Sequence, residues 1–415
     1  MIFRIFNYLS LKTFFKGIFL NQRKIKKTAE KKLRDNSNKK FLHFVGMGRT
    51  SLSLILKYLK KNNKKKNEII VQAYNLPGFL EIIEIEKFKI IFTDIDKKNG
   101  TFSIDEILKK INSKTAAVIG TNMFNNYDQL LILKKKLSSK NIPLIEDNAI
   151  YFDNFKTKKK KEFSGQLGDY SIFSFNIMKN ISAFYGGAVA HNSNEFKKFC
   201  EYQITKFQKF SKILLLKKIF IYFVLKLMST SLLYRILFFK IVYLANNLNI
   251  KFLIHIFYPS LKFKKNLQKK CLYLNLSSLS KKLIYLQLLN KRERKNNFVK
   301  RKKNNMYLYN HLMKISHKFK KTSLIPINDF NYQNFLDFPL LVDDKNKFVN
   351  YMFKNNAEVR KFHYYNCEKI FSKKKSCKNS EFFEKKLICV PSHPQITKKY
   401  LDHVITKIKE YNFKN

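Results

Sequence analysis

Acidic residues are scarce in this chain, and tryptophan is absent. The 415 residues include 83 lysines and arginines but only 29 aspartates and glutamates, which gives a formal net charge of +54 at pH 7. So large a basic excess first indicates a nucleic acid or an anionic membrane surface as partner. The lysines are spread along the whole chain, however, and no C2H2 or helix-turn-helix pattern organises them. We therefore expect no specific nucleic-acid binding.

Cysteine is also rare. The five cysteines lie far apart without C-x-x-C spacing; they are Cys200, Cys271, Cys367, Cys377 and Cys389. Neither a disulfide framework nor a zinc site is indicated, so we expect no bound metal and a reducing, cytoplasmic environment. The chain is nevertheless long and apolar enough for one large domain or two smaller ones.

Long uninterrupted apolar runs are missing too. Residues 1–24 are rich in aromatic and aliphatic side chains, but basic residues interrupt them and a signal-peptide cleavage site is absent. The segment Lys212–Ser260 is intensely apolar, yet lysines and arginines divide it into short runs, whereas a bilayer-spanning helix needs about twenty apolar residues. We interpret both segments as amphipathic elements on an anionic membrane surface. The alternatives are packing on the protein's own body for the first and a dimer hairpin for the second.

Strand and helix patterns alternate from Phe41 onward. Apolar strand patterns begin at Phe41, Glu68, Lys89, Thr115 and Pro143, and segments with helical spacing of leucine and isoleucine separate them. This alternation predicts an α/β fold with a mostly parallel sheet, whose ligands bind at the carboxyl ends of the strands. The turn from Gly46 to Ser51 places two glycines and two hydroxyl residues at a helix N-terminus, where free amides and the helix dipole favour a phosphate. A lone G-x-G is only weak support.

The stretch from Leu144 to Val189 outlines a cofactor pocket. Asp147 and Ser174 each end an apolar strand, and Lys179 lies in the turn that follows. A carboxylate at the end of a buried strand can hold a protonated pyridine nitrogen, and a poorly solvated lysine loses its proton readily enough to react with an aldehyde. Taken singly, such a lysine is more often a solvated loop residue and such an aspartate a helix cap. The ordered set is what favours a cofactor site.

These motifs together resemble the DegT/DnrJ-type sugar aminotransferases, fold-type I enzymes that use pyridoxal phosphate (PLP). The matching motifs, in chain order, are the acid at Asp147, G-D-Y at Gly168–Tyr170, S-F from Ser174, K-N from Lys179 and G-G-A-V from Gly186. The resemblance implies a large domain with a mostly parallel sheet and a smaller α+β C-terminal domain. The expected parts are a basic amphipathic N-terminal segment (1–40), the PLP-binding domain (41–210), an apolar basic insertion (211–262), a long helical connection (263–325) and the small domain (326–415).

The resemblance also implies residue roles. Lys179 would bind PLP covalently and transfer protons, and Asp147 would keep the pyridine nitrogen protonated. The residues that it assigns to the phosphate are Gly48, Arg49, Thr50 and Ser174. Tyr74 aligns with an aromatic residue that stacks on the cofactor ring in a related branch; a core tyrosine at the end of a strand is the alternative.

The function that the resemblance implies is transamination. The amino group would come from a donor, glutamate in most of the family, and would pass to a keto-sugar, normally carried on a nucleoside diphosphate. Surface polysaccharide or lipopolysaccharide synthesis is the expected use. A long helix around Gln287 matches part of the family's subunit interface, so we expect a homodimer. With the two amphipathic segments, the enzyme would lie on the cytoplasmic face of the membrane.

Departures from the family pattern affect the acceptor site and the phosphate clamp. They are Ile150 for a glutamine or histidine, Phe184 and Tyr185 for a glycine and a glutamate, and Tyr273–Asn275 for an N-Y-R from the neighbouring subunit. Two other functions stay open: a PLP-fold sensor or scaffold without transamination, and a basic protein that binds membrane or nucleic acid. Lys179 favours transamination, because a non-transaminating relative could dispense with it.

Overall fold

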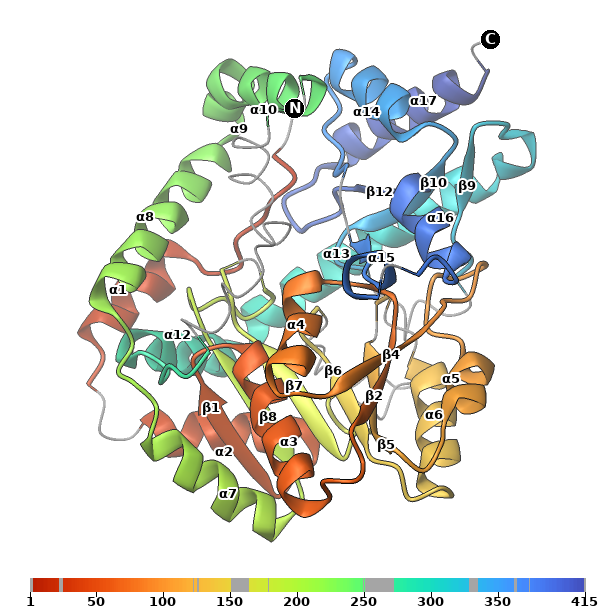
Figure 1. Cartoon of the computed structure of the whole chain (residues 1–415). Helices are drawn as coiled ribbons and strands as arrows, with labels where there is room; N and C mark the ends of the chain where they lie inside the picture. The colour runs from red at the N-terminus through yellow and green to blue at the C-terminus, as the bar shows by residue number, and fades with distance from the viewer. Residues whose placement is uncertain are drawn as a thin grey trace.

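A large and a small sheet, joined by long helices, form the framework of the computed structural model (Figure 1). The structure describes residues 3–21, 25–121, 123–124, 127–150, 164–177, 179–248, 250, 272–327, 335–361, 364–372 and 374–413.

The large sheet has seven described strands in the order β1-β8-β7-β6-β5-β2-β4. Their bounds are β1 (Phe41–Val45), β2 (Glu68–Gln72), β4 (Lys89–Thr93), β5 (Thr115–Thr121), β6 (Leu144–Asp147), β7 (Tyr170–Ser174) and β8 (Gly187–His191). The strands from β7 to β4 run parallel, and β8 is antiparallel to both β7 and β1. The predicted α/β fold with a mostly parallel sheet is confirmed.

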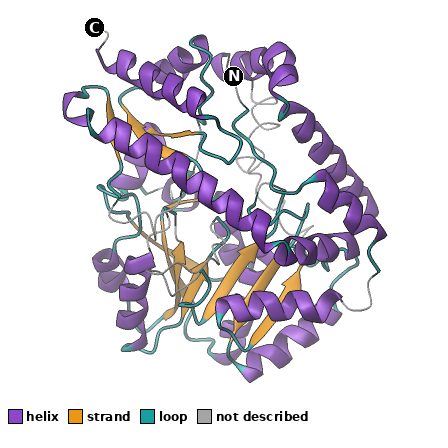
Figure 2. Ribbon diagram, turned by 180° about the vertical axis from the view of Figure 1, so that it is seen from behind, coloured by secondary structure: helices purple, strands orange, loops and turns teal. Residues whose placement is uncertain are grey.

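Helices cover both faces of this sheet (Figure 2). Along β2, Ile69 and Val71 face one side and Ile70 the other, and all three are fully buried, as expected for a strand covered on both sides. The helices on the first face are α3 (Gly48–Asn62), α4 (Pro77–Ile85) and α7 (Asn194–Thr205). Those on the second face include α2 (Ile25–Ser37), α5 (Ile104–Lys110) and α6 (Tyr127–Ser138).

The C-terminal part of the chain forms a small α+β unit around an antiparallel sheet in the order β12-β10-β9. Its elements are β9 (Thr322–Leu324), β10 (Phe338–Val342), α14 (Lys345–Lys354), α15 (Glu368–Phe371), α16 (Lys378–Lys386), β12 (Leu387–Val390) and α17 (Lys398–Phe413). The connection to the large sheet consists of α12 (Ser278–Leu289), α13 (Lys291–Met313) and the 3-10 helix η4 (Ser316–Lys318). A short antiparallel pairing of β3 (Tyr74–Asn75), which follows β2, with β11 (Tyr365–Asn366) connects the small unit to the large one.

The apolar insertion runs along one edge of the molecule (Figure 1). Its described elements are α8 (Lys212–Met228), α9 (Ser231–Leu233), the π-helix η1 (Tyr234–Phe238) and α10 (Phe239–Asn247); residues 251–260 lie outside the described residues. Helix α1 (Leu11–Phe19) lies beside α8, where the ring centroids of Phe14 and Phe223 are 5.4 Å apart. At the other end, Phe239 stacks on Phe353 of the small unit at 5.4 Å. The insertion therefore connects the two units.

Residues 3–9 differ from the predicted membrane-surface helix. They are not helical, and most of their side chains are buried. Arg4 forms an ion pair of 2.9 Å with Glu358. A ring nitrogen of His393 and the carbonyl oxygen of Phe3 form a hydrogen bond of 2.8 Å. The small unit, α8 and α13 all bond this stretch, so it packs on the protein's own body, which was the alternative given for the first segment. No helix among the described residues is both long and apolar enough to cross a bilayer.

Candidate active site

Two of the predicted site residues end neighbouring parallel strands at the same edge of the sheet. Asp147 ends β6 and is 6% exposed, and Ser174 ends β7. The Asp147 carboxylate accepts hydrogen bonds from the Ala149 amide at 2.9 Å and the Thr121 hydroxyl at 3.5 Å. Burial raises the pKa of Asp147, and these bonds together with the nearby Lys179 ammonium oppose the rise. A buried carboxylate of this kind suits a cationic partner such as a protonated pyridine nitrogen.

Lys179 lies in the turn after β7, where its amide donates to the Asn176 carbonyl at 2.9 Å. Its pKa is lowered to about 8, chiefly by burial; the Asp147 carboxylate opposes this, and the Arg360 and Arg49 guanidinium groups add to it. Near neutral pH, a larger fraction of this amine is unprotonated than of an ordinary lysine, which prepares it to react with an aldehyde. The structure therefore brings Lys179 and Asp147 together.

Glycines let the N-terminus of α3 approach the ends of β7 and β8. A Cβ atom on Gly48 would lie 3.2 Å from the Phe173 carbonyl oxygen and 3.4 Å from the Cβ of Ser174. A Cβ on Gly187 would lie only 2.3 Å from the carbonyl carbon of Met47, so the backbones could not meet with any larger residue there. The close approach places the first amides of a 15-residue helix beside Ser174. Such a helix end is suited to a phosphate.

Arg49 and Thr50, the other two predicted phosphate ligands, have different surroundings. Arg49 is half-buried at the start of α3, and its charge contributes to the low pKa of Lys179. Thr50 is fully buried; its hydroxyl donates to the Leu272 carbonyl at 2.5 Å and its amide to the Met47 carbonyl at 3.1 Å. Both donors are used within the protein, so the structure does not support Thr50 as a phosphate ligand.

The segment aligned with the family's N-Y-R packs on its own subunit. The Tyr273 hydroxyl donates to the Glu86 carboxylate at 2.8 Å, and the Leu274 carbonyl accepts a hydrogen bond of 2.9 Å from the Gly46 amide. A Cβ on Gly46 would lie 2.5 Å from that same carbonyl oxygen. This segment therefore shapes the turn that leads into α3.

Tyr74 lies in the core. It is fully buried, and its ring packs edge-on against the rings of Tyr364 and Phe383, each at 5.9 Å between centroids. Burial raises the pKa of Tyr74 well above its usual value. The structure matches the alternative given for this residue, a core tyrosine at a strand end, and does not support stacking on a cofactor ring.

The small unit contributes two residues to the site that the sequence analysis missed. Arg360 forms an ion pair of 3.3 Å with Asp337, and its charge reaches Lys179. Tyr364 lies close enough to Asp147 for that carboxylate to raise its pKa, although burial is the larger cause. One signal could have singled out Arg360: the chain has only nine arginines among its 83 basic residues. An arginine in so lysine-rich a chain marks a position where the planar guanidinium is needed.

A small hollow of about 30 Å³ opens beside Asn180, the residue after Lys179. Its lining residues are Tyr8, Asn180, Ile181, Gln287, Asn290, Glu293, Arg294, Asn297, Phe298 and Arg301. Arg301 is 2% exposed and donates to the side-chain oxygen of Asn180 at 2.8 Å and to the Tyr8 hydroxyl at 2.9 Å. The Arg301 guanidinium therefore fixes the side chain of Asn180, the residue after the reactive lysine.

A family comparison agrees with this geometry. A model of the DegT/DnrJ/EryC1/StrS aminotransferase family matches residues 11–212 and 284–409. The chain belongs to this family. The predicted recognition is confirmed, and most of the apolar insertion falls in the gap between the two matched ranges. Aminotransferases of this family use PLP, as the name of one Bacillus subtilis relative, a putative pyridoxal phosphate-dependent aminotransferase, also states.

Named relatives align with part of this family member. The GDP-perosamine synthase of Escherichia coli O157:H7 is 27% identical over 171 residues, which cover 41% of this chain and 46% of that protein. The GDP-4-keto-6-deoxy-D-mannose 3-dehydratase of Yersinia pseudotuberculosis is 25% identical over 173 residues, which cover 41% and 43%. The aligned parts span less than half the length of these relatives.

Solved structures of sugar aminotransferases share the whole fold. The Helicobacter pylori aminotransferase PseC, involved in the biosynthesis of pseudoaminic acid, superposes with a TM-score of 0.73 at 13% identity and covers 99% of each chain. The Micromonospora echinospora sugar aminotransferase CalS13 gives a TM-score of 0.69 at 12% identity, covering 99% of this chain and 100% of that one. These likenesses support the fold-type I assignment.

Two of the departures from the family pattern attach α1 and α8 to the site. Phe184 has a positive φ of 66°, a conformation that glycine adopts at lower cost. Its fully buried ring meets Phe14 of α1 at 5.9 Å and Tyr222 of α8 at 5.6 Å. Tyr185 is half-buried, with the Lys218 ammonium of α8 at 5.0 Å from its ring centroid. The two replacements therefore form a contact between the cofactor turn and the insertion.

Proposed function

We propose that this protein is a PLP-dependent aminotransferase that moves an amino group from a donor amino acid to a keto-sugar. The observation that carries the proposal is the meeting of Asp147, Lys179 and the N-terminus of α3 at one edge of the sheet. A buried carboxylate, a lysine of low pKa and a phosphate seat are the three features that PLP requires, so the described residues fit the cofactor.

Each feature has one task. PLP, when bound, supplies an electron sink that no side chain provides. Asp147 holds the proton on the pyridine nitrogen, because an unpaired carboxylate in this buried place would be costly. Lys179 would hold the cofactor through its aldehyde, and its Nζ atom would accept and return a proton. The Gly48 and Arg49 amides at the start of α3 and the Ser174 hydroxyl would hold the phosphate.

We propose that the small hollow beside Asn180 marks one end of the substrate site. Arg301 and Arg294 line it, and guanidinium groups bind carboxylate and phosphate oxygens well. We propose that Arg360, whose charge reaches Lys179, receives the donor's carboxylate, and that the donor is glutamate. A nucleotide-linked acceptor is supported by relatives whose names specify GDP- and dTDP-linked sugars, among them a dTDP-4-amino-4,6-dideoxy-D-glucose transaminase of Shigella dysenteriae. Surface polysaccharide or lipopolysaccharide synthesis is the proposed use of the product.

An amino-transfer assay tests this proposal. The purified protein with PLP is supplied with glutamate and a panel of GDP- and dTDP-linked 4-keto-6-deoxy sugars. We expect 2-oxoglutarate and the amino sugar to form in equal amounts. A dehydrated sugar without net amino transfer would instead indicate the reaction class of the dehydratase relative. PLP binding without either product would favour the sensor or scaffold alternative.

We propose a homodimer, supported by the membership of this chain in the DegT/DnrJ/EryC1/StrS aminotransferase family. Gln287, however, does not face a partner: its side chain is buried and bonds the backbone amide and carbonyl of Ser182 at 3.0 and 2.8 Å. It fixes the turn after Lys179 within its own subunit. Light scattering of the PLP-loaded protein tests the proposal; a fully active monomer would contradict it.

We also propose that the enzyme is peripheral on the cytoplasmic face of a membrane. Along α8, the exposed side chains of Ile213 (78%), Leu216 (64%) and Phe220 (70%) follow helical spacing on one face. Phe19 of α1, the helix that packs on α8 through Phe14, is 85% exposed. Residues 1–29 and 202–292 contain no aspartate or glutamate, so this exposed face meets an anionic surface without repulsion.

Point substitutions test membrane binding better than removal of the segment. Tyr222 and Tyr234 of the insertion are fully buried, so deletion would open the core. Phe220→Gln and Ile213→Gln alter only exposed positions and should reduce co-sedimentation with vesicles that contain an anionic phospholipid. If these variants instead shift the oligomeric state and leave vesicle binding unchanged, the face is a subunit interface, as in the dimer-hairpin alternative.

A further inference from the structure

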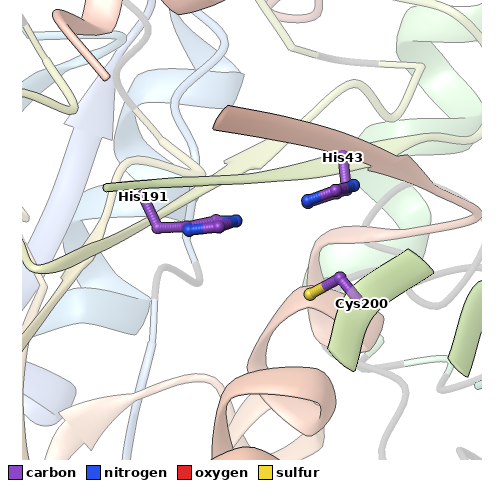
Figure 3. Close-up of side chains that lie close together, drawn as sticks. All are labelled: His43, His191 and Cys200. Atoms are coloured by element: carbon purple, nitrogen blue, oxygen red, sulfur yellow. The ribbon is translucent and has the colours of Figure 1, made fainter. Parts of the chain in front are cut away.

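A second cluster of reactive side chains lies away from the cofactor edge, between β1, β8 and α7. His43 of β1 pairs with Val189 of β8, and His191 of β8 pairs with Phe41, so the two histidines face the same side of adjacent strands. Cys200 of α7 packs onto that side. Figure 3 shows the three side chains pointing toward one another, and their ligand atoms all lie within 4.8 Å.

The cluster is enclosed by aromatic rings. His191 and Cys200 are fully buried, and the half-buried His43 provides a route from solvent. The Phe196 and Phe41 rings lie 4.6 and 5.5 Å from the His191 ring. Among the described residues, neither ring nitrogen of His191 has a partner in hydrogen-bonding geometry, although the Ser193 backbone lies near one of them. At least one ring nitrogen of this buried imidazole therefore has no hydrogen-bond partner among the described residues, which is unusual because buried polar groups are nearly always satisfied.

The chemistry of this cluster is that of a soft-metal site. The His191 ring is fully buried against the Phe196 ring, and a buried imidazole favours its neutral form, which has a lone pair to offer. Two imidazoles and a thiolate are ligands that soft and borderline ions prefer. Metal–ligand bonds of about 2.0–2.3 Å place the ligand atoms of a trigonal site roughly 3.5–4 Å apart, so small side-chain rotations would close the cluster around an ion.

Charge decides which ion fits. No carboxylate joins the cluster in the part of the chain that the structure describes. The Lys39 ammonium, held by the Gln166 and Gly168 carbonyls at 2.9 and 2.6 Å, lies near enough to help lower the pKa of His191. A divalent ion with one thiolate and two neutral imidazoles would leave a net positive charge in this buried place. A monovalent ion with one thiolate is neutral and avoids that cost.

We propose that His43, His191 and Cys200 bind a thiophilic monovalent d10 ion of the Cu(I) and Ag(I) class. Binding is a ligand exchange without oxidation or reduction: the Cys200 thiol releases its proton to solvent, and the ion accepts electron pairs from the sulfur and the two ring nitrogens. The bound ion would join β1, β8 and α7. His191 is four residues from Gly187 along β8, about 13 Å at the rise of a strand, so the site is separate from the phosphate seat.

Metal titration of the full-length, PLP-loaded protein tests the proposal. Ag(I) in chloride-free buffer serves as a redox-silent probe, and anaerobic Cu(I) is supplied through a competing chelator. We expect one tightly bound ion per chain, a raised melting temperature, and an X-ray absorption spectrum with one sulfur and two nitrogen ligands. Cys200→Ser and His43→Gln should each weaken binding by more than about tenfold, because loss of a residue that merely supports a metal ligand already lowers metal affinity by about that factor.

Matched variants keep the test decisive. Cys377→Ser changes another buried cysteine that lies outside the cluster and should bind the ion like the unaltered chain. Retained PLP absorbance shows that a variant is folded, and the half-buried His43→Gln serves if Cys200→Ser does not fold. Unchanged affinity in both cluster variants, or a spectrum without two nitrogen ligands, would overturn the site. Tighter binding of Zn²⁺ than of Cu(I) would overturn the assignment to a monovalent ion.

Discussion

The cofactor edge of the large sheet and the insertion side of the molecule are built in different ways. The insertion side comprises residues 3–9, α1, α8, α9, η1 and α10. At the cofactor edge, Asp147, Ser174 and Lys179 come from one short stretch, and neighbouring strand ends bring them together. On the insertion side, the Tyr222 hydroxyl donates to the Leu9 carbonyl at 3.2 Å across 213 sequence positions. The first arrangement follows from local patterns, whereas the second depends on distant partners.

The cofactor edge contains the reactive groups, whereas the insertion side stabilises the fold. Burial at the cofactor edge is used to shift the pKa of reactive groups, while burial on the insertion side encloses the ion pair of Arg4 with Glu358 and the Tyr234 hydroxyl that donates to the same carboxylate at 2.5 Å. Damage to the first region should therefore remove activity and spare the fold. Damage to the second should lower stability and spare the covalent attachment of PLP.

The largest expected effect follows the loss of Lys179. Lys179→Ala should reduce amino transfer by about 10²–10⁴-fold, because both the covalent attachment of PLP and the proton carrier are removed. After borohydride treatment, mass spectrometry should find no PLP on the variant. Lys345→Ala is the matched control: Lys345 also has a pKa lowered to about 8 by burial but lies in the small unit. PLP fixed to another lysine would contradict the site assignment.

The next effect tests the insertion side. Arg4→Met leaves the buried Glu358 carboxylate without its ion-pair partner and should lower the free energy of unfolding by about 3–5 kcal/mol. The double variant Arg4→Met with Glu358→Met removes both charges and should recover much of that loss. Urea unfolding measures both, and PLP attachment at low denaturant should be unchanged. A loss of PLP that parallels the loss of stability would show that the two regions are not separable.

Local chemistry is what the sequence could predict. Residues that end strands or open a helix follow from periodicity, so the sheet and the meeting of Asp147, Lys179, Ser174 and Gly48 were predictable. Thr50 and Tyr74 lie in the predicted elements, but their partners, Leu272 and Tyr364, are distant in sequence. Because these distant contacts hold the two side chains, their roles could not be predicted from the local pattern.

Non-local pairing explains the larger errors. The buried state of residues 3–9 depends on Glu358 and His393 near the other end of the chain. The cluster of His43, His191 and Cys200 exists only because β1 pairs with β8 and α7 folds back over both. An apolar, basic segment such as α8 shows in its sequence that it has a covered face, but not which partner covers it.

The pH dependence of cofactor capture measures how strongly burial acts at the cofactor edge. With a pKa of about 8 for Lys179, the unprotonated fraction rises about 50-fold between pH 6 and pH 8 and changes little above that. The rate of PLP uptake by the apoprotein, followed by absorbance, should rise in the same way. Arg360→Met removes a cation that helps to lower this pKa, so its midpoint should move to higher pH. A rate that keeps rising toward pH 10 would show an ordinary lysine.

The smallest expected effect concerns the charges beside the exposed apolar face. Lys217 is exposed on α8, and Lys217→Gln should weaken binding to phosphatidylserine vesicles by about 1 kcal/mol, or roughly fivefold. Lys64→Gln, an exposed lysine after α3, is the matched control and should bind unchanged. High salt should remove the difference between the two variants but leave residual binding through the apolar side chains, which salt does not screen. Equal binding of both variants at low salt would mean that α8 does not face the lipid, and would favour a second copy of this chain as the cover of that face.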